Sequence, residues 1–219
     1  MKKKTKNYFA VSGLMFLVFV LFTILVACYN VEPVGPDESS VGFADINRYV
    51  FQLLGVHLLW YHITDWLGVG AILFAFGFAM LGLCQLIRRK SLRNMDARLF
   101  VLGAFYILVI ACYLFFEQVV INYRPVILGE GLEASYPSSH TVIVVCIMAT
   151  AAMQFRALCP NRRNWCLSMN ITASLLITVT VAGRLISGVH WFTDIVGGLL
   201  LSAALIALFC AVVKWLEEQ

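Results

Sequence analysis

The sequence predicts an all-α, polytopic membrane protein built as a bundle of six transmembrane helices. Three observations predict this fold class: 61% of the 219 residues are hydrophobic, only 13% are charged, and the mean hydropathy is +0.87. A typical soluble domain carries about twice that share of charged residues. Several apolar stretches approach the roughly 20 residues that are needed to cross a bilayer. The length is compatible with one domain, so we predict a single membrane domain over residues 1–219.

Six apolar stretches, taken with their flanks, are the predicted spans. They cover residues 8–27, 67–87, 99–121, 141–155, 166–186 and 195–213. A polar loop, residues 29–47, and a mixed segment, residues 46–66, separate the first two spans. The mixed segment is rich in Trp, Tyr and His, and aromatic side chains favour the membrane interface. We therefore predict that residues 46–66 form an extracytoplasmic interfacial helix, with His57 and His62 as interface residues.

The first apolar stretch has two interpretations. It follows four Lys and ends in LVAC at residues 25–28, which resembles a lipoprotein cleavage site. Its length of about 20 residues exceeds the usual 7–15-residue core of a signal peptide. The length favours a retained helix, and lipoprotein processing at Cys28 is the alternative.

The distribution of charge predicts the orientation. With the N-terminus inside, 13 of the 16 Lys and Arg lie on the inner side, as the positive-inside rule requires. Arg48, Arg124 and Arg184 lie outside, together with nine of the twelve acidic residues. We expect a multi-pass protein with both termini cytoplasmic, and the small chain with short tails favours a bacterial cytoplasmic membrane. The chain has no basic run with interleaved aromatics, so no nucleic-acid partner is expected.

Residues 184–194, RLISGVHWFTD, place ionisable groups between two apolar runs at the predicted outer face. Ionisable side chains are costly in hydrocarbon and by default mark a functional site. His190 and Asp194 are four residues apart, so on a helix they share one face and the carboxylate can hold the imidazole. This pairing is typical of an activated nucleophile. A polar patch without chemistry at a helix–loop junction is the alternative.

Two further polar groups are expected on the same face. Arg124 follows the third span, and Ser138, Ser139 and His140 begin the fourth span after a proline. A helix N-terminus attracts anions, and Arg matches phosphate oxygens bidentately. One His can attack while the other protonates the leaving group. Together with Arg184, these residues predict a phosphate site.

These pieces resemble the three-part signature of the type 2 phosphatidic acid phosphatase (PAP2) superfamily. The family pattern is Lys, six residues, Arg-Pro; then Pro-Ser-Gly-His; then Ser-Arg, five residues, His, three residues, Asp. The resemblance covers residues 117–194, and the matching positions are Arg124 with Pro125, Pro137 with Ser138 and His140, and Arg184 with His190 and Asp194.

The resemblance implies a metal-independent phosphatase without a cofactor. It implies that His190 attacks phosphorus to form a phosphohistidine, that Asp194 holds the other ring nitrogen, and that His140 is the general acid. Phosphoryl transfer depends mainly on positioning and charge stabilisation. The residues that the resemblance assigns to phosphate binding are Arg124, Arg184, Ser138 and Ser139, the last through its backbone N–H.

Three residues depart from the family pattern. Gly183 replaces a Ser, and Ser139 replaces a Gly at some cost in backbone freedom. Glu117 occupies the position of the family Lys, seven residues before Arg124 and on the same helix face. A carboxylate cannot donate to phosphate. We therefore expect Glu117 to pair with an Arg or to be protonated by burial.

We predict a phosphatase that hydrolyses a lipid phosphate or pyrophosphate at the outer membrane face. Its expected partners are the bilayer and a membrane lipid phosphate, with undecaprenyl pyrophosphate and phosphatidic acid as equal favourites, and no metal is expected. Because of Glu117, the alternative is a catalytically silent relative that binds a lipid phosphate or acts as a membrane structural or interaction protein. A transporter would place its charges near the midplane on broken helices, and a haloperoxidase relative would have the Lys and a soluble scaffold.

Overall fold

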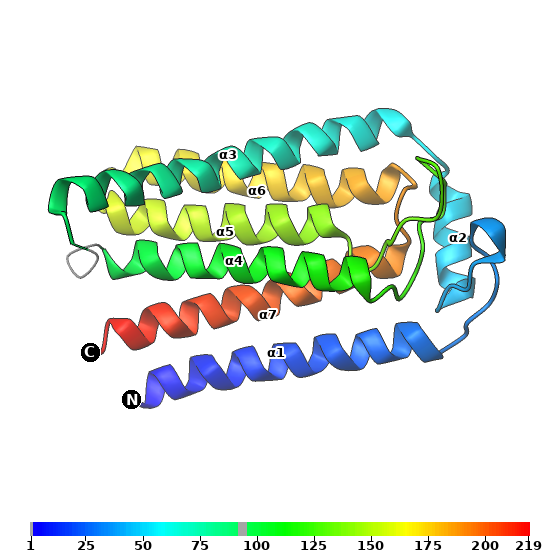
Figure 1. Ribbon diagram of the computed structural model, residues 1–219, viewed down its shortest axis with the longest axis horizontal. Helices are drawn as coiled ribbons and strands as arrows, with labels where there is room; N and C mark the ends of the chain where they lie inside the picture. Colours follow the sequence, from blue (N-terminus) through cyan, green and yellow to red (C-terminus); the bar gives the residue numbers. More distant parts are fainter. Residues whose placement is uncertain (1, 92–95) are drawn as a thin grey trace.

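The protein is a bundle of long helices with a short helix across one end (Figure 1). The computed structural model describes residues 2–91 and 96–219. In this part of the chain, six helices are long and apolar enough to cross a membrane, as the sequence predicts. They are α1 (Lys3–Cys28), α3 (Leu58–Arg89), α4 (Ala97–Gln118), α5 (Ser139–Leu158), α6 (Arg163–Ile186) and α7 (Phe192–Leu216).

The ends of the bundle differ in what they contain. Both termini lie at one end, together with the connection between α5 and α6 (Figure 1). The opposite end holds α2 (Ala44–Leu54), the short 3-10 helix η1 (Pro36–Glu38), and the connections from α4 to α5 and from α6 to α7. We call this the α2 end. All the motif residues predicted from the sequence lie at or near it.

The helical segment between the first two spans differs from the prediction. α2 ends at Gly55, whose φ of 70° lies in the region that favours glycine. α3 then begins at Leu58, so the prediction of one interfacial helix over residues 46–66 is wrong in its second half. The charged residue there, Asp65, forms an ion pair with Arg184. Because that charge is compensated within the protein, the segment can continue as a span.

α5 and α7 form the centre of the bundle. In the most apolar 18 residues of each helix, the share of buried residues is 56% for α5 and 50% for α7, and it is 22% or less for the other spans. The two helices pack closely near their beginnings because Gly198 on α7 faces Thr141 on α5, and the neighbouring Gly197 faces the ring of Tyr136, just before α5, where a side chain would collide. The Tyr136 hydroxyl also lies 2.8 Å from Thr23 Oγ1 on α1. The beginnings of the two central helices are therefore fixed relative to each other.

Candidate active site

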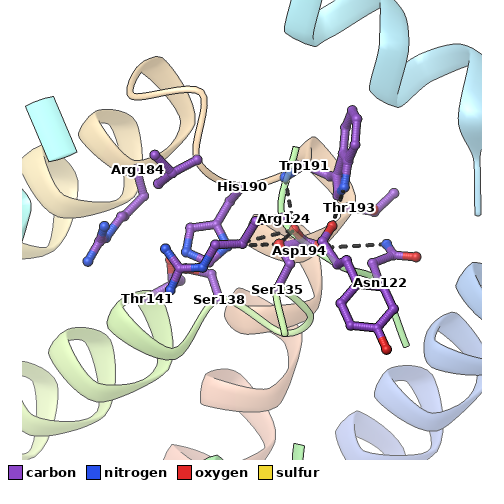
Figure 2. A network of polar contacts seen from close by, with 12 residues as sticks. Asn122, Arg124, Ser135, Ser138, Thr141, Arg184, His190, Trp191, Thr193 and Asp194 are labelled. Carbon is purple, nitrogen blue, oxygen red and sulfur yellow. Dashed lines mark hydrogen bonds and ion pairs between the residues drawn. The ribbon is translucent and has the colours of Figure 1, made fainter. Parts of the chain in front are cut away.

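The structure brings the predicted motif residues together at the α2 end. Figure 2 shows Arg124 from the α4–α5 connection, Ser138 at the start of α5, Arg184 near the end of α6, His190 in the α6–α7 connection, and Asp194 in the first turn of α7. Between these positions the chain runs along α5 to the opposite end of the bundle and returns along α6. Residues separated by up to 70 positions in the sequence therefore contribute to one polar cluster.

Arg184 forms an ion pair with a residue that the sequence reasoning missed. Arg184 is fully buried, and its Nη2 lies 2.5 Å from Oδ1 of Asp65 on α3. The same carboxylate oxygen lies 3.1 Å from Nε2 of His140, the second residue of α5. The ring of Tyr61 lies 5.1 Å from the guanidinium carbon of Arg184. Asp65 thus links the predicted phosphate-binding Arg to the predicted general acid. The sequence offered one sign of this role, because Asp65 is a carboxylate inside a largely apolar stretch.

Several nitrogens of these side chains have no hydrogen-bond partner among the described residues. They are buried atoms on four residues of this cluster: Nε and Nη1 of Arg184, Nη1 of Arg124, Nδ1 of His140 and Nε2 of His190. Buried polar atoms are normally paired, and leaving one unpaired costs about 1–3 kcal/mol. Unpaired nitrogens on four neighbouring side chains therefore indicate a site shaped for a ligand rich in oxygen atoms.

His190 and Asp194 are close, and a third residue lies between them. Nδ1 of His190 is 3.7 Å from Oδ2 of Asp194, which is longer than a hydrogen bond. The Ser135 Oγ lies 3.2 Å from this Nδ1 and donates to Asp194 Oδ2. Sequence reasoning missed Ser135, because a single Ser in a connecting segment carries no distinguishing pattern.

The protonation of His190 is set by its surroundings. Burial lowers the pKa of His190 below its ordinary value of 6.5, and the nearby Arg124 and Arg184 lower it further. Asp194 acts in the opposite direction and does not cancel the effect of burial. At neutral pH the imidazole is therefore uncharged and carries a free electron pair, as a nucleophile requires.

Asp194 is held by donors from three parts of the chain. Besides Ser135, the backbone N–H of Trp191 donates to Oδ2 at 2.8 Å, and the Asn122 amide donates to Oδ1 at 3.4 Å. The first turn of α7 is also held by α2, because Asn47 bonds both the backbone N–H and the hydroxyl of Thr193. The carboxylate therefore has a fixed position relative to the imidazole.

Arg124 and Glu117 are arranged differently from what the sequence suggested. Arg124 Nε lies 3.0 Å from Glu133 Oε2, and its backbone N–H donates to the Glu133 carbonyl. Glu117 is exposed near the end of α4 and lines a narrow cleft with Ser135 and Ser139. Within the described residues, the two site arginines thus pair with Glu133 and Asp65, and Glu117 has no ion-pair partner.

The start of α5 supplies the remaining predicted residues. Ser138 is buried, its backbone N–H donates to the Asp194 carbonyl at 3.0 Å, and its Oγ accepts from Thr141 at 3.1 Å. Ser139 is the first residue of the helix, where backbone N–H groups have no partner within the helix. The described residues contain no group of three His, Cys, Asp or Glu that could hold a metal ion.

Comparison with known proteins supports one family. Residues 115–218 match the model of the PAP2 superfamily. The structure is similar to the crystal structure of the first transmembrane PAP2-type phosphatidylglycerolphosphate phosphatase from Bacillus subtilis, with a TM-score of 0.62 and 16% sequence identity over 93% of this chain and 96% of that chain. No curated protein matched the sequence. The predicted resemblance to the superfamily and the predicted fold class are confirmed.

Proposed function

We propose, from the match of residues 115–218 to the PAP2 superfamily, that the protein is a membrane phosphatase acting on a lipid phosphate or pyrophosphate. The observation that supports this most directly is the set of unpaired buried nitrogens on Arg124, His140, Arg184 and His190. A phosphoryl group presents oxygen atoms to both arginines and its phosphorus to the imidazole.

In the first step, Nε2 of His190 attacks phosphorus. The N–P bond forms as the bond from phosphorus to the leaving oxygen breaks, which gives a phosphohistidine. Arg124 and Arg184 stabilise the charge on the phosphoryl oxygens, together with the backbone N–H groups at the start of α5. Asp194 stabilises the positive charge that develops on the His190 ring.

His140 moves the protons in this scheme. Its Nε2 is held by Asp65, so its Nδ1 is the nitrogen that donates a proton to the leaving oxygen, and this nitrogen is left with a free electron pair after the first step. In the second step water attacks phosphorus and gives a proton to the same His140 nitrogen. The N–P bond to His190 breaks, which releases inorganic phosphate and restores the imidazole. The two histidines therefore have separate roles, which their different carboxylate partners support.

The location of the site suggests the side of the membrane and the kind of substrate. Most Lys and Arg belong to segments at the opposite end of the bundle from the site. By the positive-inside rule we place the α2 end on the extracytoplasmic face of a bacterial cytoplasmic membrane. The substrate phosphate then rests at the interface with its tail in lipid. Undecaprenyl pyrophosphate, phosphatidic acid and phosphatidylglycerol phosphate all have this form.

The test is phosphate release by the purified protein in detergent, with these three lipids and with EDTA present. We expect release from at least one lipid, and EDTA is expected to leave the rate unchanged because none of the proposed steps uses a metal ion. Failure to release phosphate from all three lipids would favour the silent relative.

Glu117→Lys is expected to increase activity. Because Glu117 is exposed and forms no ion pair within the described residues, the change should not disturb folding. It replaces a repulsive charge near the site by an attractive one, and about 1 kcal/mol of such stabilisation corresponds to roughly fivefold in kcat/KM.

The matched control is Glu130→Lys, which makes the same charge change at another exposed residue. An equal increase in both variants would indicate a general effect of charge on lipid binding. A loss of activity in Glu117→Lys alone would show that the carboxylate has a role of its own.

A further inference from the structure

We propose that Ser135 is a positioning residue that connects the Asp194 carboxylate to the His190 imidazole through two consecutive hydrogen bonds, an arrangement that we call the relay. The catalytic part of this inference rests on the proposed function. The position of the proton on the His190 ring does not rest on it, because that position follows from contacts within the protein.

The distances favour a relay over a direct contact. A direct N–H···O bond spans about 2.7–3.2 Å, whereas Nδ1 of His190 and Oδ2 of Asp194 are 3.7 Å apart. The Ser135 Oγ contacts both atoms: it lies 3.2 Å from Nδ1 and donates a hydrogen bond to Oδ2. All three residues are buried, with exposed fractions of 2% for Ser135, 4% for His190 and 0% for Asp194. Bulk water therefore does not compete for these contacts.

The chemistry of the groups fixes the direction of the relay. An ionised carboxylate only accepts hydrogen bonds, so the Ser135 hydroxyl proton goes to Asp194. The Ser135 oxygen then accepts from His190, which places the imidazole proton on Nδ1. The free electron pair is left on Nε2, the ring atom that has no partner among the described residues. The relay thus makes Nε2 the nucleophilic nitrogen for a phosphate that the neighbouring arginines bind.

Ser135 is itself held in place by neighbours on both sides. Its backbone N–H donates to the Asn122 carbonyl at 2.9 Å, and the Asn122 side chain reaches Oδ1 of the same Asp194. The adjacent Tyr136 packs against Gly197 of α7. Because Asn122 contacts both Ser135 and Asp194, the hydroxyl and the carboxylate are positioned as a unit (Figure 2).

The kinetic test compares Ser135→Ala with Ser135→Thr in the full-length protein. Ala removes the hydroxyl and leaves Asp194 too far from Nδ1 to replace it. We expect kcat to fall about 10–100-fold with little change in KM, because a positioning residue contributes less than the roughly 10²–10⁴-fold of a group that itself transfers a proton. Thr keeps the hydroxyl and is expected to restore most of the rate. Ser202→Ala is the matched control, because this buried hydroxyl donates to the Gly198 carbonyl within α7. Full activity in Ser135→Ala would overturn the relay.

Nitrogen-15 NMR of the histidine side chains tests the relay without a substrate. The chain has four His, and His190→Gln identifies the signal of interest. We expect His190 to carry its proton on Nδ1 in the wild type and to lose this preference in Ser135→Ala. An unchanged tautomer in Ser135→Ala would refute the relay even if kcat falls. If no lipid phosphate is hydrolysed, the proposed function fails while this measurement still decides the relay.

Discussion

His190→Ala is expected to abolish phosphate release. His190 has the free ring nitrogen that faces the site, and burial keeps it uncharged. No other residue among those described combines an unpaired nitrogen with a carboxylate relay. Removing a nucleophile typically costs several orders of magnitude, so we expect a loss of at least about 1,000-fold in kcat. The measurement is phosphate release from the best lipid of the panel.

A matched control separates this effect from the loss of any histidine. His62 is exposed on α3 beside Tyr61, and His62→Ala is expected to keep the wild-type rate within about twofold, as for most surface substitutions. Protein incubated with a lipid carrying a radiolabelled phosphate and quenched in alkaline denaturant, in which the N–P bond survives, should contain labelled phosphohistidine in the wild type and none in His190→Ala. Labelled protein in His190→Ala would show that a different residue is the nucleophile.

The fold was largely predictable because each membrane span is a local property of the sequence. A stretch of about 20 apolar residues predicts a helix regardless of what surrounds it. The boundary at residues 46–66 was not predictable in this way. Whether Asp65 can enter a span depends on Arg184, which is 119 residues away in the sequence. A neutralised charge inside the bundle cannot be distinguished from an interfacial charge by composition alone.

The site was predictable only in part, for a related reason. His190 and Asp194 could be found because both lie in one short stretch between two apolar runs, although His190 precedes α7 and does not share a helical turn with Asp194 as the sequence analysis assumed. Ser135 and Glu133 could not, since both contact the site only after the α4–α5 connection folds across the ends of the helices. Ser135 contacts His190 and Asp194, and Glu133 pairs with Arg124, so both residues help to hold the motif groups. Their contacts join residues that are far apart in the sequence, and such contacts cannot be predicted from one sequence alone.

Asp65→Ala is expected to lower both stability and activity. Breaking a buried ion pair by removing one partner typically costs about 3–5 kcal/mol. Arg184 is fully buried but the Asp65 side chain is 34% exposed, so water reduces this cost and we expect about 1–3 kcal/mol. The His140 ring also loses its only hydrogen-bond partner among the described residues. The measurements are thermal unfolding in detergent and kcat/KM.

Asp65 can also be regarded as a competitor of phosphate, because it occupies an Arg that the substrate would bind. The contacts favour a positioning role instead. Asp65 binds Nη2 of Arg184, while Nε and Nη1 stay free for phosphoryl oxygens. Asp65→Asn separates the two roles, since it keeps an acceptor oxygen and removes the charge. A positioning residue predicts a partial loss of kcat/KM in this variant, and a competitor predicts an increase. Asp45→Asn, at an exposed position on α2, is the control for the lost charge.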